Sequence, residues 1–151
     1  MRAALKGLAD YLQAELDALD GAAVTVHRDY AYGVAAPYVI VSTGSHPTTD
    51  ALLGGQAADS TSGTILTTSV GATADQARWV ADRVRGILAP DLRPLRFATD
   101  DRLIEVSWAP TLGVVEVDRD VTLPNTRTHP ALTHEEFLFS AHAFTPATES
   151  S

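Results

Sequence analysis

Three acidic side chains alternate with other residues late in the chain: Glu116, Asp118 and Asp120. In an extended strand they would share one face, with successive side chains about 6.6–7 Å apart. Carboxylates in such a row can transfer protons or bind a hard cation. Burial of the residues on the opposite face would explain the alternation equally well, and that face would carry Val115, Val117 and Val121. We favour this second interpretation, in which the acids face solvent or a partner.

No other group of residues has the spacing of a known catalytic or metal-binding motif. The chain contains no cysteine, which excludes disulfides, thiol nucleophiles and cysteine-ligated metals. The motifs GxSxG, SxxK and HExxH and the phosphate-binding glycine motifs are missing. The histidines lie singly, at His27, His46, His129, His134 and His142. We therefore assign no catalytic residue, no metal ligand and no cofactor, and predict that the protein is not an enzyme.

The chain is acidic, with 11 basic and 19 acidic residues and a net charge of −8. Residues 100–120 hold six acids against Arg102 and Arg119, a net charge of −4. No stripe of lysine and arginine follows a phosphate backbone, so we expect no specific binding of DNA. The charge of this segment would repel a polyanion such as DNA.

Length and composition indicate one folded domain. The chain has 151 residues, of which 45% are hydrophobic and 20% charged, unlike a disordered protein. We expect the domain to span residues 1–144 and to be followed by a flexible polar tail at 145–151. No apolar run approaches the ~20 residues of a membrane span, and no signal peptide is recognisable. We expect a soluble protein made in the cytoplasm.

Hydrophobic periodicity predicts two helices. Leucines at steps of three and four mark the first helix, from residue 5 to residue 19, and Gly21 ends it. The second helix runs from residue 74 to residue 88, where Thr73 and Gln76 form a capping box. This helix is long enough to cover much of one face of a sheet.

Alternating or continuous apolar residues predict seven strands, at 23–29, 38–41, 63–70, 95–98, 103–108, 114–121 and 133–144. The segment 38–41 is apolar on both faces, and we predict it as the central strand. Residues 45–62 lack periodicity and are predicted as a long loop at the tip of a hairpin. The fold class expected from this order is α+β, a single antiparallel or mixed sheet packed with two helices.

Two further features are candidate partner contacts. The long loop contains the apolar pair Leu52 and Leu53 beside the hinge-capable pair Gly54 and Gly55. We predict that this loop is mobile in the free subunit and becomes ordered on assembly. Trp79 lies off the apolar stripe of the second helix, where it is either a partner contact or a half-buried core residue.

Five features follow one another along the chain: the motif Pro37-Tyr38-Val39-Ile40-Val41, the long hairpin, a capped helix carrying Ala77, Val80 and Val84, the segment 115–121 with Pro124, and the closing aromatic strand with its segment 136–141. In this order they resemble the tail-terminator, or tail-completion, family of long, non-contractile-tailed phages, in the form found in phages of actinobacteria. The resemblance extends from Leu5 to Phe144 and is one of architecture, because no invariant short motif defines the family.

The resemblance implies a tail-terminator-like fold and a structural virion protein. Such a protein assembles as a homo-oligomer, commonly a hexameric ring, which caps the tail tube and forms the face that docks to the head. The implied partners are the tail-tube protein and a neck or head-closure protein, with DNA passing through unbound and no membrane involved. The implied location is the virion tail, reached from the host cytoplasm.

Two alternatives stay open on the sequence. One is a neck or head-closure connector protein of the same virion. The other is a small metal-dependent enzyme that uses the face of Glu116, Asp118 and Asp120.

Overall fold

The computed structural model describes residues 2–44, 48–50, 60–100, 102–110 and 113–143, which form an α+β fold. The helices are α1 (Arg2–Asp17) and α2 (Ala74–Leu88), followed by the short 3-10 helix η1 (Pro90–Leu92). The strands are β1 (Thr25–Arg28), β2 (Tyr38–Thr43), β3 (Thr48–Asp50), β4 (Ser60–Gly71), β5 (Leu95–Ala98), β6 (Arg102–Ala109), β7 (Glu116–Val117) and β8 (Ala131–Ala143). The fold class expected from the sequence is confirmed.

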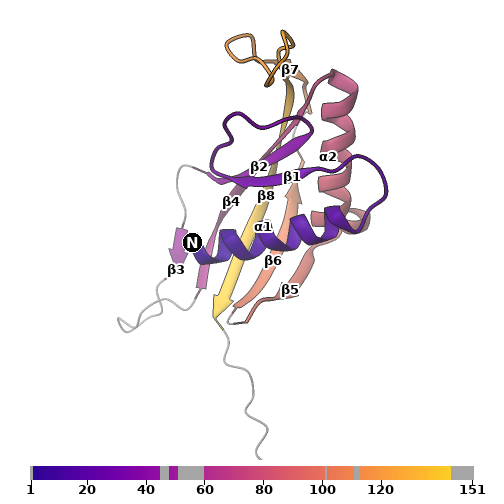
Figure 1. Cartoon of the computed structure of the whole chain (residues 1–151). Helices are drawn as coiled ribbons and strands as arrows, with labels where there is room; N and C mark the ends of the chain where they lie inside the picture. Colours follow the sequence, from indigo (N-terminus) through magenta and orange to yellow (C-terminus); the bar gives the residue numbers. More distant parts are fainter. Residues whose placement is uncertain (1, 45–47, 51–59, 101, 111–112, 144–151) are drawn as a thin grey trace, which may run out of the picture.

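One mixed sheet contains all eight strands (Figure 1). The order is β1-β2-β4-β8-β6-β5, with β3 paired to β4 and β7 paired to β8. The pair β1 and β2 is parallel and every other pair is antiparallel. The long strands β4 and β8 form the middle of the sheet, where residues 60–71 pair with residues 131–142.

The prediction that residues 38–41 form the central strand is wrong. Strand β2 lies second from one edge, between β1 and β4. The two faces of β2 are apolar for different reasons. Val39 and Val41 on one face lie in the core, whereas Tyr38 on the other face shares a groove with Leu123 and Pro124. Residues 121–124 therefore cover the opposite face of the sheet beside Tyr38.

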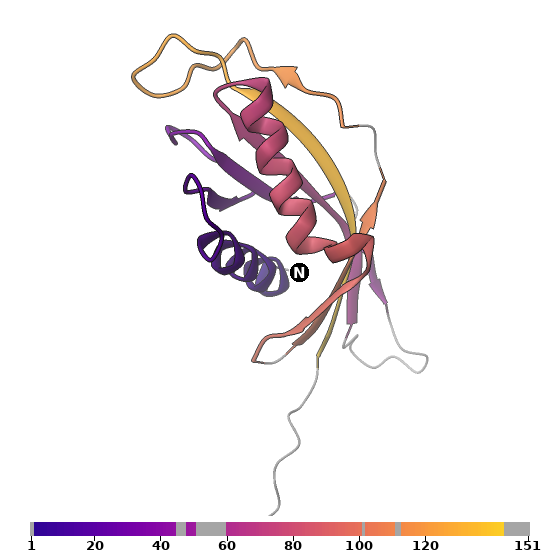
Figure 2. The same ribbon diagram turned by 90° about the vertical axis from the view of Figure 1, so that its right-hand side faces the viewer.

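Both helices pack on the same face of the sheet, which curls around them (Figure 2). The core combines leucines of α1, the stripe of α2 and the inward side chains of the strands in one cluster. Helix α1 ends at Asp17, two residues before the predicted end, and Leu19 is exposed. Gln13 of α1 reaches the free edge of β1, where its Nε2 donates to the Val24 carbonyl at 3.0 Å and its Oε1 accepts from Val26 N–H at 2.7 Å.

Helix α2 has the predicted limits and the predicted cap. The Thr73 hydroxyl accepts a hydrogen bond from Gln76 N–H at 3.1 Å. The Gln76 side chain accepts from Ala72 N–H at 2.7 Å, one residue before the donor that a capping box would supply. Both ends of the β4 to α2 connection are thereby fixed.

The segment 114–121 is not the strand that its alternation predicts. Only Glu116 and Val117 form strand β7. The Asp118 side chain accepts a hydrogen bond from Asp120 N–H at 3.0 Å, a local turn that ends the strand. Val117 and Val121 are about half exposed, so the valines do not form the expected buried face.

Residues 45–62 are not a continuous loop. Strand β3 pairs residues 48–50 with residues 60–62 of β4, which lengthens the predicted hairpin beyond β2. Threonine and serine supply this pairing without apolar periodicity, so the pattern did not reveal it. Residues 51–59 and the tail at 145–151 lie outside the described residues.

Candidate interaction surfaces

The face of the sheet opposite the helices carries no helix of the described chain, and we call it the outer face. The alternation along β8 determines this face, because Phe137, Phe139 and Ala141 are buried while Leu138 is 56% exposed. Leu103 of β6 also lies on the outer face and is 42% exposed. The other outward side chains include small and polar residues and some partly exposed apolar ones.

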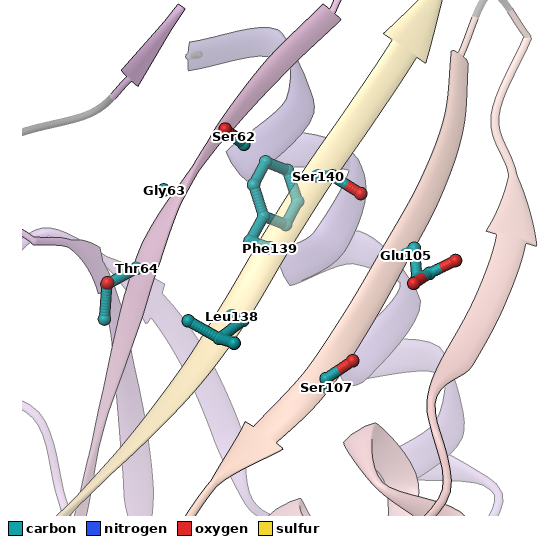
Figure 3. A pocket seen from close by; sticks show the side chains of 8 residues that line it. All are labelled: Ser62, Gly63, Thr64, Glu105, Ser107, Leu138, Phe139 and Ser140. Carbon is teal, nitrogen blue, oxygen red and sulfur yellow. The ribbon is translucent and has the colours of Figure 1, made fainter.

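A shallow hollow of about 460 Å³ lies on the outer face, across β4, β8 and β6 (Figure 3). The register brings two rows of side chains together there, Ser62, Ser140 and Glu105 in one row and Thr64, Leu138 and Ser107 in the next. The hollow forms over Ser62 and Ser140 because serine side chains are short, and the Leu138 side chain protrudes beside it. The Glu105 carboxylate accepts from Arg96 at 2.6 Å and is still 37% exposed. The hollow thus combines an apolar wall with hydroxyl groups and a carboxylate.

Residues 29–37, which connect β1 to β2, form a second surface that we call the tyrosine loop. Tyr30 is 77% exposed and Tyr32 is 92% exposed. The base of the loop is held by Asp29 N–H, which donates to the Val41 carbonyl at 2.9 Å. Gly33 adopts a φ of 65°, which a side chain would resist, and so supports the turn beside Tyr32.

The tyrosine loop and the segment 121–124 together line an apolar groove. Tyr32 and Val34 face Val121, Leu123 and Pro124 across it. Val121 is 48% exposed, so the apolar area at this end of the molecule comes from two distant parts of the sequence. Exposed aromatic side chains of this kind are enriched at protein interfaces.

The acids Glu116, Asp118 and Asp120 do not share a strand face. With Leu132 and His134 they line a separate shallow hollow at the β7 end of the sheet. Within the described ranges, no three histidine, aspartate or glutamate side chains lie close enough together to hold a metal ion. Asp118 contributes to raising the pKa of Tyr38, although burial of the tyrosine is the larger cause.

Trp79 is half-buried and contacts other residues of its own chain. The guanidinium of Arg83 lies 4.4 Å from the centre of the indole ring, and the ring also packs against the core. A side chain at Gly21 would approach the ring to 3.2 Å, so the turn after α1 lies directly against it. These contacts account for the position of Trp79 without a partner. Leu52, Leu53, Gly54 and Gly55 lie outside the described residues.

Glu135 is a buried acid that belongs to no sequence motif. It lies on the inner face of β8, where Arg85 of α2 donates to its Oε1 at 3.2 Å. Arg85 also pairs with Asp82. Burial raises the pKa of Glu135, Arg85 opposes this effect, and Asp82 adds to it. The alternation of β8 places residue 135 on the apolar face, and this was the signal that could have identified it.

The chain matches no family model, no curated protein and no solved structure. In the part of the chain that is described, no helix is both long enough and apolar enough to cross a membrane.

Proposed function

We propose that this protein is a structural subunit of a phage tail, which assembles as a ring, caps the tail tube and presents the face that joins the head. The observation that carries the proposal is the pair of open surfaces on one compact scaffold. A sheet face that is open around the protruding Leu138 lies on one side, and a loop with two exposed tyrosines projects elsewhere. A subunit that contacts neighbours on two different surfaces can close into a ring.

The sequence resemblance to tail terminators supports the same role. It also supplies the partners, which are the tail-tube protein on one side of the ring and a neck or head-closure protein on the other. The net charge of −8 is consistent with a ring through which DNA passes without adhering. We propose the virion tail as the location and the host cytoplasm as the site of synthesis.

Labelling of virions is the direct test. Antibody raised against the purified protein is expected to mark the junction between head and tail in particles of the phage that encodes it. Particles that lack the protein by mass spectrometry would overturn a virion role.

Disruption of the gene distinguishes a terminator from a neck protein. An uncapped tube has no defined end, so loss of a terminator is expected to give tails of irregular length without heads. Loss of a neck or head-closure protein would instead leave tails of normal length unjoined to heads. The metal-dependent enzyme is not proposed further, because no three acids or histidines of the described residues lie close enough together to hold a metal ion.

A further inference from the structure

We propose that the tyrosine loop of one copy docks into the outer-face hollow of the next copy. This inference rests on the proposed ring and names the two surfaces that would form it. Tyr30 and Tyr32 are the projecting group, and the hollow bordered by Leu138, Ser140 and Glu105 is the receiving group.

The two surfaces match in chemistry. A tyrosine has an apolar ring and a polar hydroxyl, so it suits a site with an apolar wall and hydrogen-bond acceptors. Leu138 offers that wall, and the partly exposed Glu105 carboxylate can accept a hydrogen bond from a phenol. Tyrosines are among the residues that dominate interface energies once they are desolvated.

The charges of the two surfaces are compatible. The tyrosine loop begins beside Arg28, and Arg28 and Asp29 cancel each other, so this part of a strongly acidic chain is neutral. It can therefore approach an acidic face without like-charge repulsion. Glu136 is exposed on the outer face next to the hollow, where Arg28 of the incoming copy would find an opposite charge.

The hollow cannot be filled by the tyrosine loop of the same chain. Tyr32 shares a groove with Tyr38, which pairs with Val70 of β4. Ser62, in the hollow, lies eight residues before Val70 in β4, which corresponds to about 26 Å of strand. The projecting and receiving surfaces therefore belong to different copies, and such a head-to-tail contact closes into a ring when the rotation between neighbouring copies allows it.

Two variants separate the two halves of the contact. Tyr30→Ser with Tyr32→Ser removes the projecting group, and Ser140→Trp fills the hollow with a residue that strands accept. Each variant alone is expected to weaken self-association by about 30-fold or more in sedimentation velocity, the loss typical of a removed aromatic hot spot. Leu92→Ser is the matched control, because Leu92 is 65% exposed outside both surfaces, and this variant should assemble as wild type does.

Mixing the two variants gives the decisive result. The serine variant keeps an intact hollow and the tryptophan variant keeps intact tyrosines, so a mixture is expected to form one heterodimer and nothing larger in native mass spectrometry. Circular dichroism of each variant checks that it is folded.

Three results would overturn the inference: variants that assemble as wild type does, a mixture that forms no heterodimer, or a wild-type chain that stays monomeric at millimolar concentration. Labelling of the head–tail junction tests the virion role independently of these results, although a monomeric wild type would also count against the proposed ring.

Discussion

Gln13 fixes the free edge of β1 with two hydrogen bonds from a single side chain. Its amide donates to the Val24 carbonyl and accepts from Val26 N–H, as the backbone of another strand would. Gln13→Ala leaves both backbone groups without this partner and is expected to lower the free energy of unfolding by about 1–3 kcal/mol. Urea denaturation measures the change.

Glu15→Ala is the control for this variant, since Glu15 is exposed on the same helix. Its effect should stay within about 0.5 kcal/mol. Equal losses for the two variants would show that Gln13 does not anchor the strand edge.

Glu135 makes stability depend on pH in a direction opposite to that of an ordinary surface ion pair. Burial raises its pKa in the folded protein, despite Arg85. At pH values between the pKa of Glu135 in the unfolded protein and its higher pKa in the folded protein, the folded state binds more protons. The contribution of Glu135 to stability is therefore present below the unfolded pKa and is lost as pH rises through the folded pKa. Glu135→Gln removes the titrating group. The stability of the wild type relative to this variant is therefore expected to fall with rising pH.

Urea denaturation at several pH values tests this expectation. Glu136→Gln, at the exposed neighbouring position, should show no comparable fall. A wild type that becomes more stable relative to Glu135→Gln as pH rises would contradict a raised pKa for the buried carboxyl.

Individual residues of the candidate surfaces were only partly predictable from the sequence. The alternation along β8 separates the buried Phe137 and Phe139 from Leu138 and Ser140. It could not identify the hollow, because the hollow depends on which residues of β4 and β6 pair beside them. Tyr30 and Tyr32 lie between a strand and a proline in a segment without periodicity, so nothing local distinguished exposed rings from buried ones.

The connection between β4 and α2 leaves no room for a side chain at Gly71. A methyl group there would lie 2.5 Å from the Ala77 nitrogen and 2.8 Å from the Gln76 carbonyl carbon. Because these are backbone atoms, the helix would have to move. Gly71→Ala is expected to cost at least the ~1–3 kcal/mol of an overpacked core. Thermal unfolding measures this loss.

Gly86 provides the matched substitution in α2. A methyl group there meets no atom within 4 Å. Gly86→Ala is therefore expected to stabilise the helix by about 0.5–1 kcal/mol, because alanine loses less backbone freedom on folding. Stability changes of opposite sign for the two Gly→Ala variants would support the close approach at Gly71, and equal stability changes would refute it.

Elements with several independent local signals were predicted best. Helix α2 has a cap, an apolar stripe and a following proline, and its predicted limits match the structure. The segment 114–121 had alternation alone, and the turn at Asp118 overrode it. The position of β2 in the sheet was not predictable from its own residues, because it depends on the long pairing of β4 with β8 and on the segment that covers Tyr38.

At the scale of the whole molecule, the acidic residues of the segment 100–120 do not gather in one patch. Asp100 lies at the β5 to β6 turn, near the end of β8 at Ala143, whereas Glu116 pairs with Leu132 near its beginning. The charge is thus distributed along the sheet. Duplex DNA is expected to show no binding in fluorescence anisotropy even at low salt, where attraction to basic proteins is strongest.

A charge-reversed variant is the positive comparison for this experiment. Glu116→Lys with Asp120→Lys should bind DNA more than the wild type does, and salt should weaken that binding. Wild-type binding that declines steeply with salt would contradict the expectation of unbound passage.

The pairing of β4 with β8 has a mechanical consequence. Residues 60–71 and 131–142 are joined along their whole length by hydrogen bonds perpendicular to the strands. A tension that pulls the two strands past each other stretches all of these bonds together, so they resist as one unit and do not open in sequence. The short strands β3 and β7, with three and two residues, are joined to the sheet by fewer bonds and would yield at a lower force. Under the proposed role, a tail assembled from such subunits would be stiff along β8.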